Sequence, residues 1–82
     1  MIDIDKLMDR LHAAATDAAE LMAAGKMSAA AEVMITTGNL GRLVGTHPDA
    51  ESMSLASQEK LAQAEALGDA LTMKFREHGI VN

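Results

Sequence analysis

Gly38, Gly41 and Gly45 have the spacing that comes nearest to a chemical site in this 82-residue chain. A glycine-rich loop can hold a phosphate with its backbone N–H groups when it lies between a strand and a helix and continues into Lys-Ser or Lys-Thr. Here Arg42 and Leu43 follow Gly41, and no strand pattern precedes the first glycine. We therefore interpret the glycines as sites of close backbone packing or helix termination.

The imidazoles and carboxylates do not form the pattern of a catalytic or metal site. His12, His47 and His78 lie on different segments, and none has a second histidine three or four residues away, as a helical metal site requires. Cysteine is absent, which excludes thiolate ligands and disulfides. A general acid or base needs a carboxyl group in a dry cleft, whereas Asp3, Asp5 and other acids fall on polar helix positions. We expect no catalytic residue, metal, cofactor or small-molecule substrate, and hence no enzyme.

Charge and hydropathy argue against two further classes of partner. The formal net charge is −5, and the seven Lys and Arg residues are scattered along a chain whose one aromatic residue is Phe75. Nucleic-acid binding needs a clustered basic face, and single strands also favour stacked aromatic side chains. Charged residues interrupt each apolar stretch before it reaches the length of a membrane span, and the acidic opening is unlike a signal peptide. The expected location is cytoplasmic.

The elements that position these residues are predicted to be helices. Alanine, leucine and methionine dominate the apolar residues and favour helix over strand. Gly25 can close a first helix, Ser28 can cap a second, Pro48 stops it, and Gly79 ends the third and longest. The pattern predicts an all-α single domain, residues 1–82, built as a small bundle of three helices at about 4–24, 28–44 and 49–78.

A two-helix arrangement is the alternative. If Gly25 does not break the chain, Val33, Leu40 and Val44 continue the apolar stripe of the first helix. The molecule would then be an uneven hairpin with one long helix. This alternative places Lys26 on the apolar stripe, so three helices are favoured.

The second helix is apolar on two faces, which predicts two neighbours. One face is a narrow seam of small residues and methionines: Met27, Ala31, Met34, Gly38, Gly41 and Gly45. An interior glycine costs roughly 0.5–1 kcal/mol relative to alanine, and close approach of another helix can offset that cost. We expect the alanine-rich first helix to pack closely at Ala31, Gly38 and Gly41.

The other face of the second helix is predicted to meet a second copy of the chain. It carries Val33, Leu40, Leu43 and Val44. A core from so short a chain is thin, and a homodimer or higher oligomer would complete the bundle. Two further apolar residues, Leu55 and Met73, project away from the apolar face of the third helix and are candidate protein contacts.

Two functions fit this pattern. The first is a non-enzymatic interaction or assembly module, an adaptor that self-associates through apolar helix faces. The second is a small acidic regulator, such as a secretion chaperone or an inhibitor, that binds a basic protein surface. Added salt separates them, because it weakens charge-driven binding and leaves apolar assembly intact.

Overall fold

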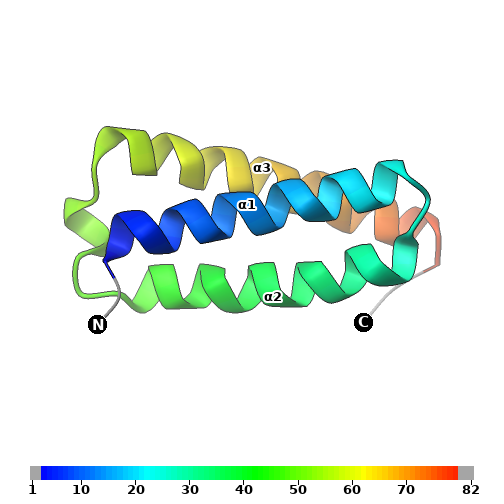
Figure 1. Ribbon diagram of the computed structural model, residues 1–82, viewed down its shortest axis with the longest axis horizontal. Helices are drawn as coiled ribbons and strands as arrows, with labels where there is room; N and C mark the ends of the chain where they lie inside the picture. Colours follow the sequence, from blue (N-terminus) through cyan, green and yellow to red (C-terminus); the bar gives the residue numbers. More distant parts are fainter. Residues whose placement is uncertain (1–2, 80–82) are drawn as a thin grey trace.

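The computed structural model describes residues 3–79, which fold into three α-helices (Figure 1). Within those residues there is no strand, so the predicted all-α architecture is confirmed. A short 3₁₀ turn, η1, lies in the connection before the last helix, which is the longest at 23 residues. The helices are α1, Ile4–Ala23, α2, Met27–Thr46, and α3, Leu55–Glu77, with η1 at Ala50–Ser52.

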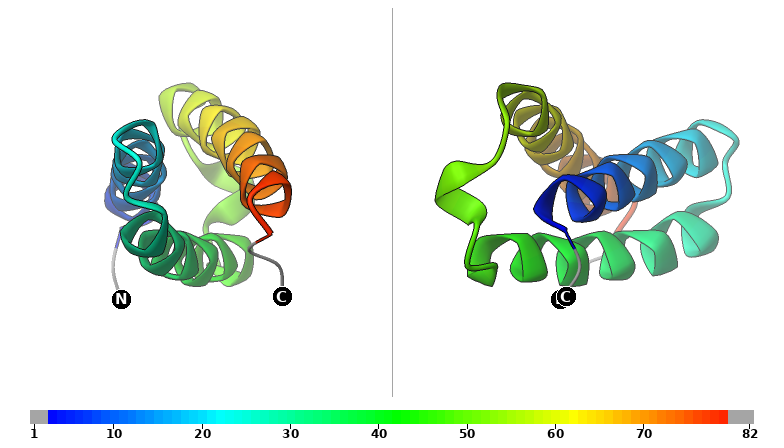
Figure 2. Two further views of the ribbon diagram at one scale, coloured as in Figure 1. Left: turned by 90° about the vertical axis from the view of Figure 1, so that its right-hand side faces the viewer. Right: turned by 60° about the vertical axis from the view of Figure 1, so that its left-hand side comes forward.

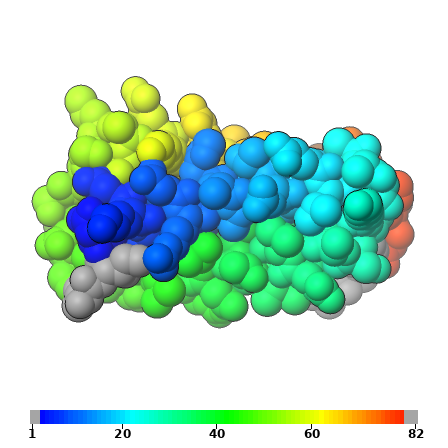
Figure 3. All heavy atoms as spheres, in the orientation of Figure 1, coloured from blue at the N-terminus to red at the C-terminus, as the bar shows by residue number. Residues whose placement is uncertain are grey.

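The chain runs along α1, returns along α2, and then runs along α3 in the direction of α1 (Figure 1). The α1 helix packs along both of the others, whereas α2 and α3 touch each other only sparsely. Figure 3 shows the α1–α2 contact as a continuous surface on one side of the molecule. The end-on view shows α3 inclined away from that pair (Figure 2). The α1 helix is therefore the centre of the fold.

Gly25 breaks the chain between α1 and α2. Its φ of +78° is a left-handed conformation that glycine adopts without steric cost. The N–H groups of Gly25 and Lys26 donate to the carbonyl oxygens of Met22 and Leu21, at 3.0 and 2.9 Å, and so close the last turn of α1. This glycine cap establishes three helices instead of a hairpin.

The second helix begins slightly earlier than predicted. Lys26 is its N-cap residue, and Ser28 lies inside the first turn, where its side chain does not cap the helix. The helix continues to Thr46, where Thr46 donates its hydroxyl hydrogen to the carbonyl of Arg42 at 2.9 Å. Proline disfavours a helical backbone in the residue before it. His47, which precedes Pro48, is accordingly extended, and the helix ends before it.

The third helix begins at Leu55, not near Asp49. Met53 has an extended backbone and places its side chain in the core, which interrupts any helix that would start earlier. Ser54 is the N-cap residue, and its hydroxyl oxygen accepts a hydrogen bond from the backbone N–H of Ser57 at 3.1 Å. The other end fits the prediction, since Gly79, with φ +79°, closes the last turn.

Two apolar clusters along α1 make up the core. The first joins Ile4, Leu7, Met8 and other α1 residues to α2, α3 and the connection between them. Met8 has an exposed fraction of 0% and is the largest fully buried side chain. The second cluster lies toward the other end, where Phe75 and Leu71 of α3 pack with alanines of α1 and α2. The second cluster therefore brings α2 and α3 into contact near one end of the molecule.

Polar side chains join α1 to α3 along one side. Three residues of α1 each pair with a residue of α3 about fifty positions further along the chain. The separation stays nearly constant because the two helices run parallel. The pairs are Asp5 with Ser57, Asp9 with Lys60, and His12 with Gln63. These interactions align α3 with α1 along their length.

Candidate protein-binding groove

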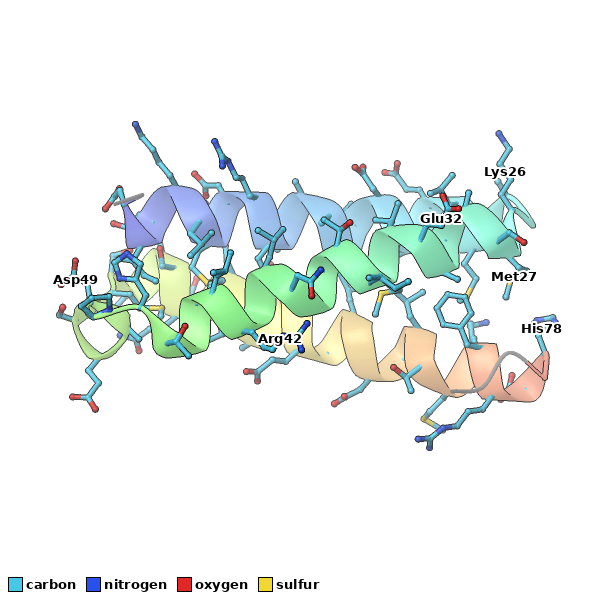
Figure 4. All side chains as sticks on the ribbon, turned by 90° about the horizontal axis from the view of Figure 1, so that it is seen from below. Lys26, Met27, Glu32, Arg42, Asp49 and His78 are labelled. Atoms are coloured by element: carbon cyan, nitrogen blue, oxygen red, sulfur yellow. The ribbon has the colours of Figure 1, made fainter. Side chains whose placement is uncertain are left out.

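A groove of about 470 Å³ lies between α2 and α3. Leu11 of α1 lies on its floor with Leu61 and Ala64 of α3, so the bottom of the groove is apolar. The groove exists because α2 and α3 both pack on α1 and cross obliquely without closing on each other (Figure 4). Its walls are the facing sides of these two helices.

The α2 wall has little side-chain bulk. Gly38 and Gly41 line it together with Met34 and Thr37. A Cβ atom placed on either glycine would meet no heavy atom within 4 Å, and the same holds for Gly68 on the α3 wall. The backbone at these positions is therefore open to the groove.

This openness corrects the expected close packing of α1 against the glycines. Ala31 does pack, against the second core cluster, but Gly38 and Gly41 do not approach another helix within the chain. The reason is that α2 turns its other face to α1, where Ala30 and Val44 are buried. The glycine seam is thereby left beside the groove.

The polar character of the groove comes from carboxylates. Glu65 and Asp69, one helical turn apart, lie on the α3 wall and are exposed. The two threonines of the groove already donate their hydroxyl hydrogens within their own helices, Thr37 to Val33 at 2.9 Å and Thr72 to Gly68 at 2.8 Å. The side chains that line the groove thus carry negative charge and no positive charge.

Arg42 lies near the opposite edge. It projects from α2 beside the groove (Figure 4) and donates a hydrogen bond to the side-chain oxygen of Asn39 on the same helix. The two edges therefore differ in charge: carboxylates follow α3, and a guanidinium flanks α2.

The face of α2 that was expected to meet a second copy belongs mostly to the core. Val44 has an exposed fraction of 2%, and Leu40 packs beside it on the first cluster. Val33 packs on the second cluster, and only Leu43, at 54%, is exposed. Val33, Leu40 and Val44 hold α2 on α1 and are not an outer face.

The two apolar residues predicted on the outer side of α3 are exposed. Leu55 has an exposed fraction of 77% and Met73 of 62%. Neither lines the groove, and they lie near opposite ends of the helix. The structure thus does not bring Leu55 and Met73 together with Gly38 and Gly41.

The histidines remain apart. His12 bonds to Gln63 of α3, and the ring of His47 accepts a hydrogen bond from the backbone N–H of Asp49 at 3.0 Å. Among residues 3–79, no three His, Asp or Glu side chains are grouped so that they could hold a metal ion. None of the described helices is both long and apolar enough to cross a membrane.

Comparison of the chain with protein-family models, with curated proteins and with solved structures gave no match. The groove is therefore interpreted from its own geometry.

Sequence reasoning identified the glycine seam but missed the carboxylates that face it. Glu65 and Asp69 have the four-residue spacing that places two side chains on one helix face, next to Leu61 and Gly68. This spacing was a usable signal. The two carboxylates face the glycines of α2 because of the relative orientation of α2 and α3. The residue pattern of a single helix does not contain that orientation.

Proposed function

We propose that the protein is a non-enzymatic interaction module that binds one amphipathic helix of another protein in the groove between α2 and α3. The observation that carries this proposal is that α1 packs along both neighbours while α2 and α3 meet only near one end. Diagonal helices of a four-helix bundle have this relationship, and the bundle core is completed by a fourth helix. A bound helix would cover the apolar floor in the same way.

The groove is large enough to hold a row of side chains from one face of a bound helix. A cavity of about 150 Å³ accommodates a molecule of benzene, so 470 Å³ has room for about three side chains of that size. Amphipathic helices bind grooves by inserting apolar residues from successive turns. Three such residues correspond to a contact of two to three turns.

The glycines support the same interpretation. In the isolated chain, Gly38 and Gly41 lower the helical stability of α2 by roughly 0.5–1 kcal/mol each, and no intramolecular contact offsets this cost. A helix that lies against the bare backbone gains close contacts that larger side chains would prevent.

Of the two functions predicted from the sequence, the groove favours binding of another protein over self-assembly. The face expected to drive self-assembly is largely used by the chain's own core. A cytoplasmic location remains a prediction. The partner in our proposal is a separate polypeptide, and occupation of the groove by a second copy is an outcome that the test distinguishes.

The test uses a synthetic amphipathic helix of about 18 residues, five turns long, with a leucine ridge, glutamine elsewhere and one tryptophan. The protein contains neither tryptophan nor tyrosine, so indole fluorescence reports on the peptide alone. We expect saturable binding to the wild type. Gly41→Leu should abolish it by filling the groove, whereas Gly45→Leu, one turn beyond the groove on the same helix, should bind normally.

Three outcomes would overturn the proposal. The first is that no saturable binding to the wild type is seen. The second is that Gly41→Leu and the wild type bind the peptide equally. The third, seen by sedimentation, is a wild-type dimer that Gly41→Leu converts to a monomer, because a second copy would then occupy the groove.

A further inference from the structure

We infer that the helix bound in this groove carries lysine or arginine on the flank that faces α3 and bulky aliphatic residues on the ridge that faces α2. The inference rests on the proposed function and specifies the partner's chemistry. It follows from the two walls of the groove, which differ in charge and in side-chain volume.

The α3 wall selects the charge of the partner. Glu65 and Asp69 are one turn apart, so two cations separated by one turn on the facing helix can approach both carboxylates. Repulsion between the two carboxylates is relieved when a cation lies between them. An acidic flank would instead place like charges across the groove, which disfavours binding.

The α2 wall selects the shape of the partner and its orientation. Gly38 and Gly41 leave room for leucine- or isoleucine-sized side chains against the backbone. Arg42 beside this wall disfavours a second basic flank on that side. A partner with one basic flank therefore binds with that flank toward α3, and only one rotation about the helix axis satisfies both walls.

The α1 helix of a second copy does not offer such a segment. Its exposed cations on α1, Lys6 and Arg10, lie on the polar side of a helix whose apolar face is buried in its own core. The net charge of −5 also makes two copies repel each other. Both features favour a basic segment of a different protein.

The test compares two versions of the leucine-ridge peptide that differ only in one flank, which carries lysine in one version and glutamate in the other. At low salt we expect the lysine peptide to bind about tenfold more tightly, the combined effect of two exposed ion pairs and two removed repulsions. The difference should shrink as salt is added, because charges about 10 Å apart are screened at 0.1 M ionic strength.

A charge-matched pair of variants assigns the effect to the groove. Glu65→Gln with Asp69→Asn should bring the two peptides to nearly equal affinity. The control, Glu20→Gln with Glu59→Gln, removes two exposed acids that do not line the groove and should leave the preference almost unchanged.

The results also separate this inference from the proposed function. If both peptides bind equally well and Gly41→Leu blocks both, the groove binds helices but the inferred basic flank is wrong. The inference would also be overturned if the control variant, Glu20→Gln with Glu59→Gln, lost the preference for the lysine peptide as fully as Glu65→Gln with Asp69→Asn. The preference would then come from the net charge of the protein. If no peptide binds, the proposed function itself is wrong.

Discussion

The carboxylate of Asp5, on the first turn of α1, accepts a hydrogen bond from the hydroxyl of Ser57, on the first turn of α3. The hydroxyl of Ser54 donates to the same carboxylate oxygen at 3.2 Å, while its oxygen caps α3. A carboxylate at this place also faces the positive end of the α3 dipole. One side chain thus connects the starts of two parallel helices.

Acid should weaken this connection. The hydrogen bond from Ser57, with a smaller contribution from Ser54, lowers the pKa of Asp5 below its ordinary value. Because the folded state favours the carboxylate, the stabilisation is present above about pH 4 and is lost as pH falls through the lowered folded-state pKa. We expect Asp5→Asn to reduce stability at neutral pH and to flatten its decline in acid, measured by urea unfolding across pH.

Asp17→Asn is the control for this measurement. Asp17 is an exposed acid three turns further along α1. Its replacement should leave the acid dependence near that of the wild type. Identical pH profiles for Asp5→Asn and the wild type would contradict the role given to Asp5.

The cap of α3 can be tested with two serines. Ser54→Ala removes the acceptor for the backbone N–H of Ser57 and should lower the free energy of unfolding by about 1 kcal/mol. Ser28→Ala lies inside the first turn of α2, where alanine is the better helix former, so it should be neutral or slightly stabilising. Chemical denaturation measures both changes. A larger loss for Ser28→Ala would mean that Ser28 caps α2 after all.

Replacing glycine by alanine should raise the free energy of unfolding at some positions and lower it at others. Gly38→Ala and Gly41→Ala should each raise the free energy of unfolding by roughly 0.5–1 kcal/mol, because the added Cβ meets open space in a helix interior. Gly25→Ala should lower it by about 1–2 kcal/mol, because its φ of +78° is strained for alanine. Thermal and urea unfolding provide the measurement, and destabilisation by Gly41→Ala would show that another part of the chain closes on the groove.

Two methionines distinguish the core from the surface. Met8→Ala should reduce the free energy of unfolding by about 2–5 kcal/mol, because its side chain is fully buried and leaves a cavity in the first core cluster. Met73→Ala should change it by less than about 0.5 kcal/mol, because that side chain is largely exposed. Comparable losses for the two variants, measured by denaturant unfolding, would contradict the assignment of the core to α1.

The sequence by itself determined the local structure. The apolar period of Ile4, Leu7 and Leu11 places one face of α1 in the core, and Gly25 and Gly79 end helices because they can adopt positive φ. These features depend on residues within one or two turns of each other. The start of α3 was misplaced because the burial of Met53, which lies outside any helix, depends on the packing of α1 against the connection.

Only the tertiary structure decided how the two faces of α2 are used. The sequence showed a bulky face with Val44 and a bare face with Gly38, and each was compatible with a neighbour inside the chain. In the fold, α1 takes the bulky face because larger side chains bury more apolar area. The third helix packs on another side of α1, with polar pairs between the two helices, and does not cover the glycines, so the groove stays open.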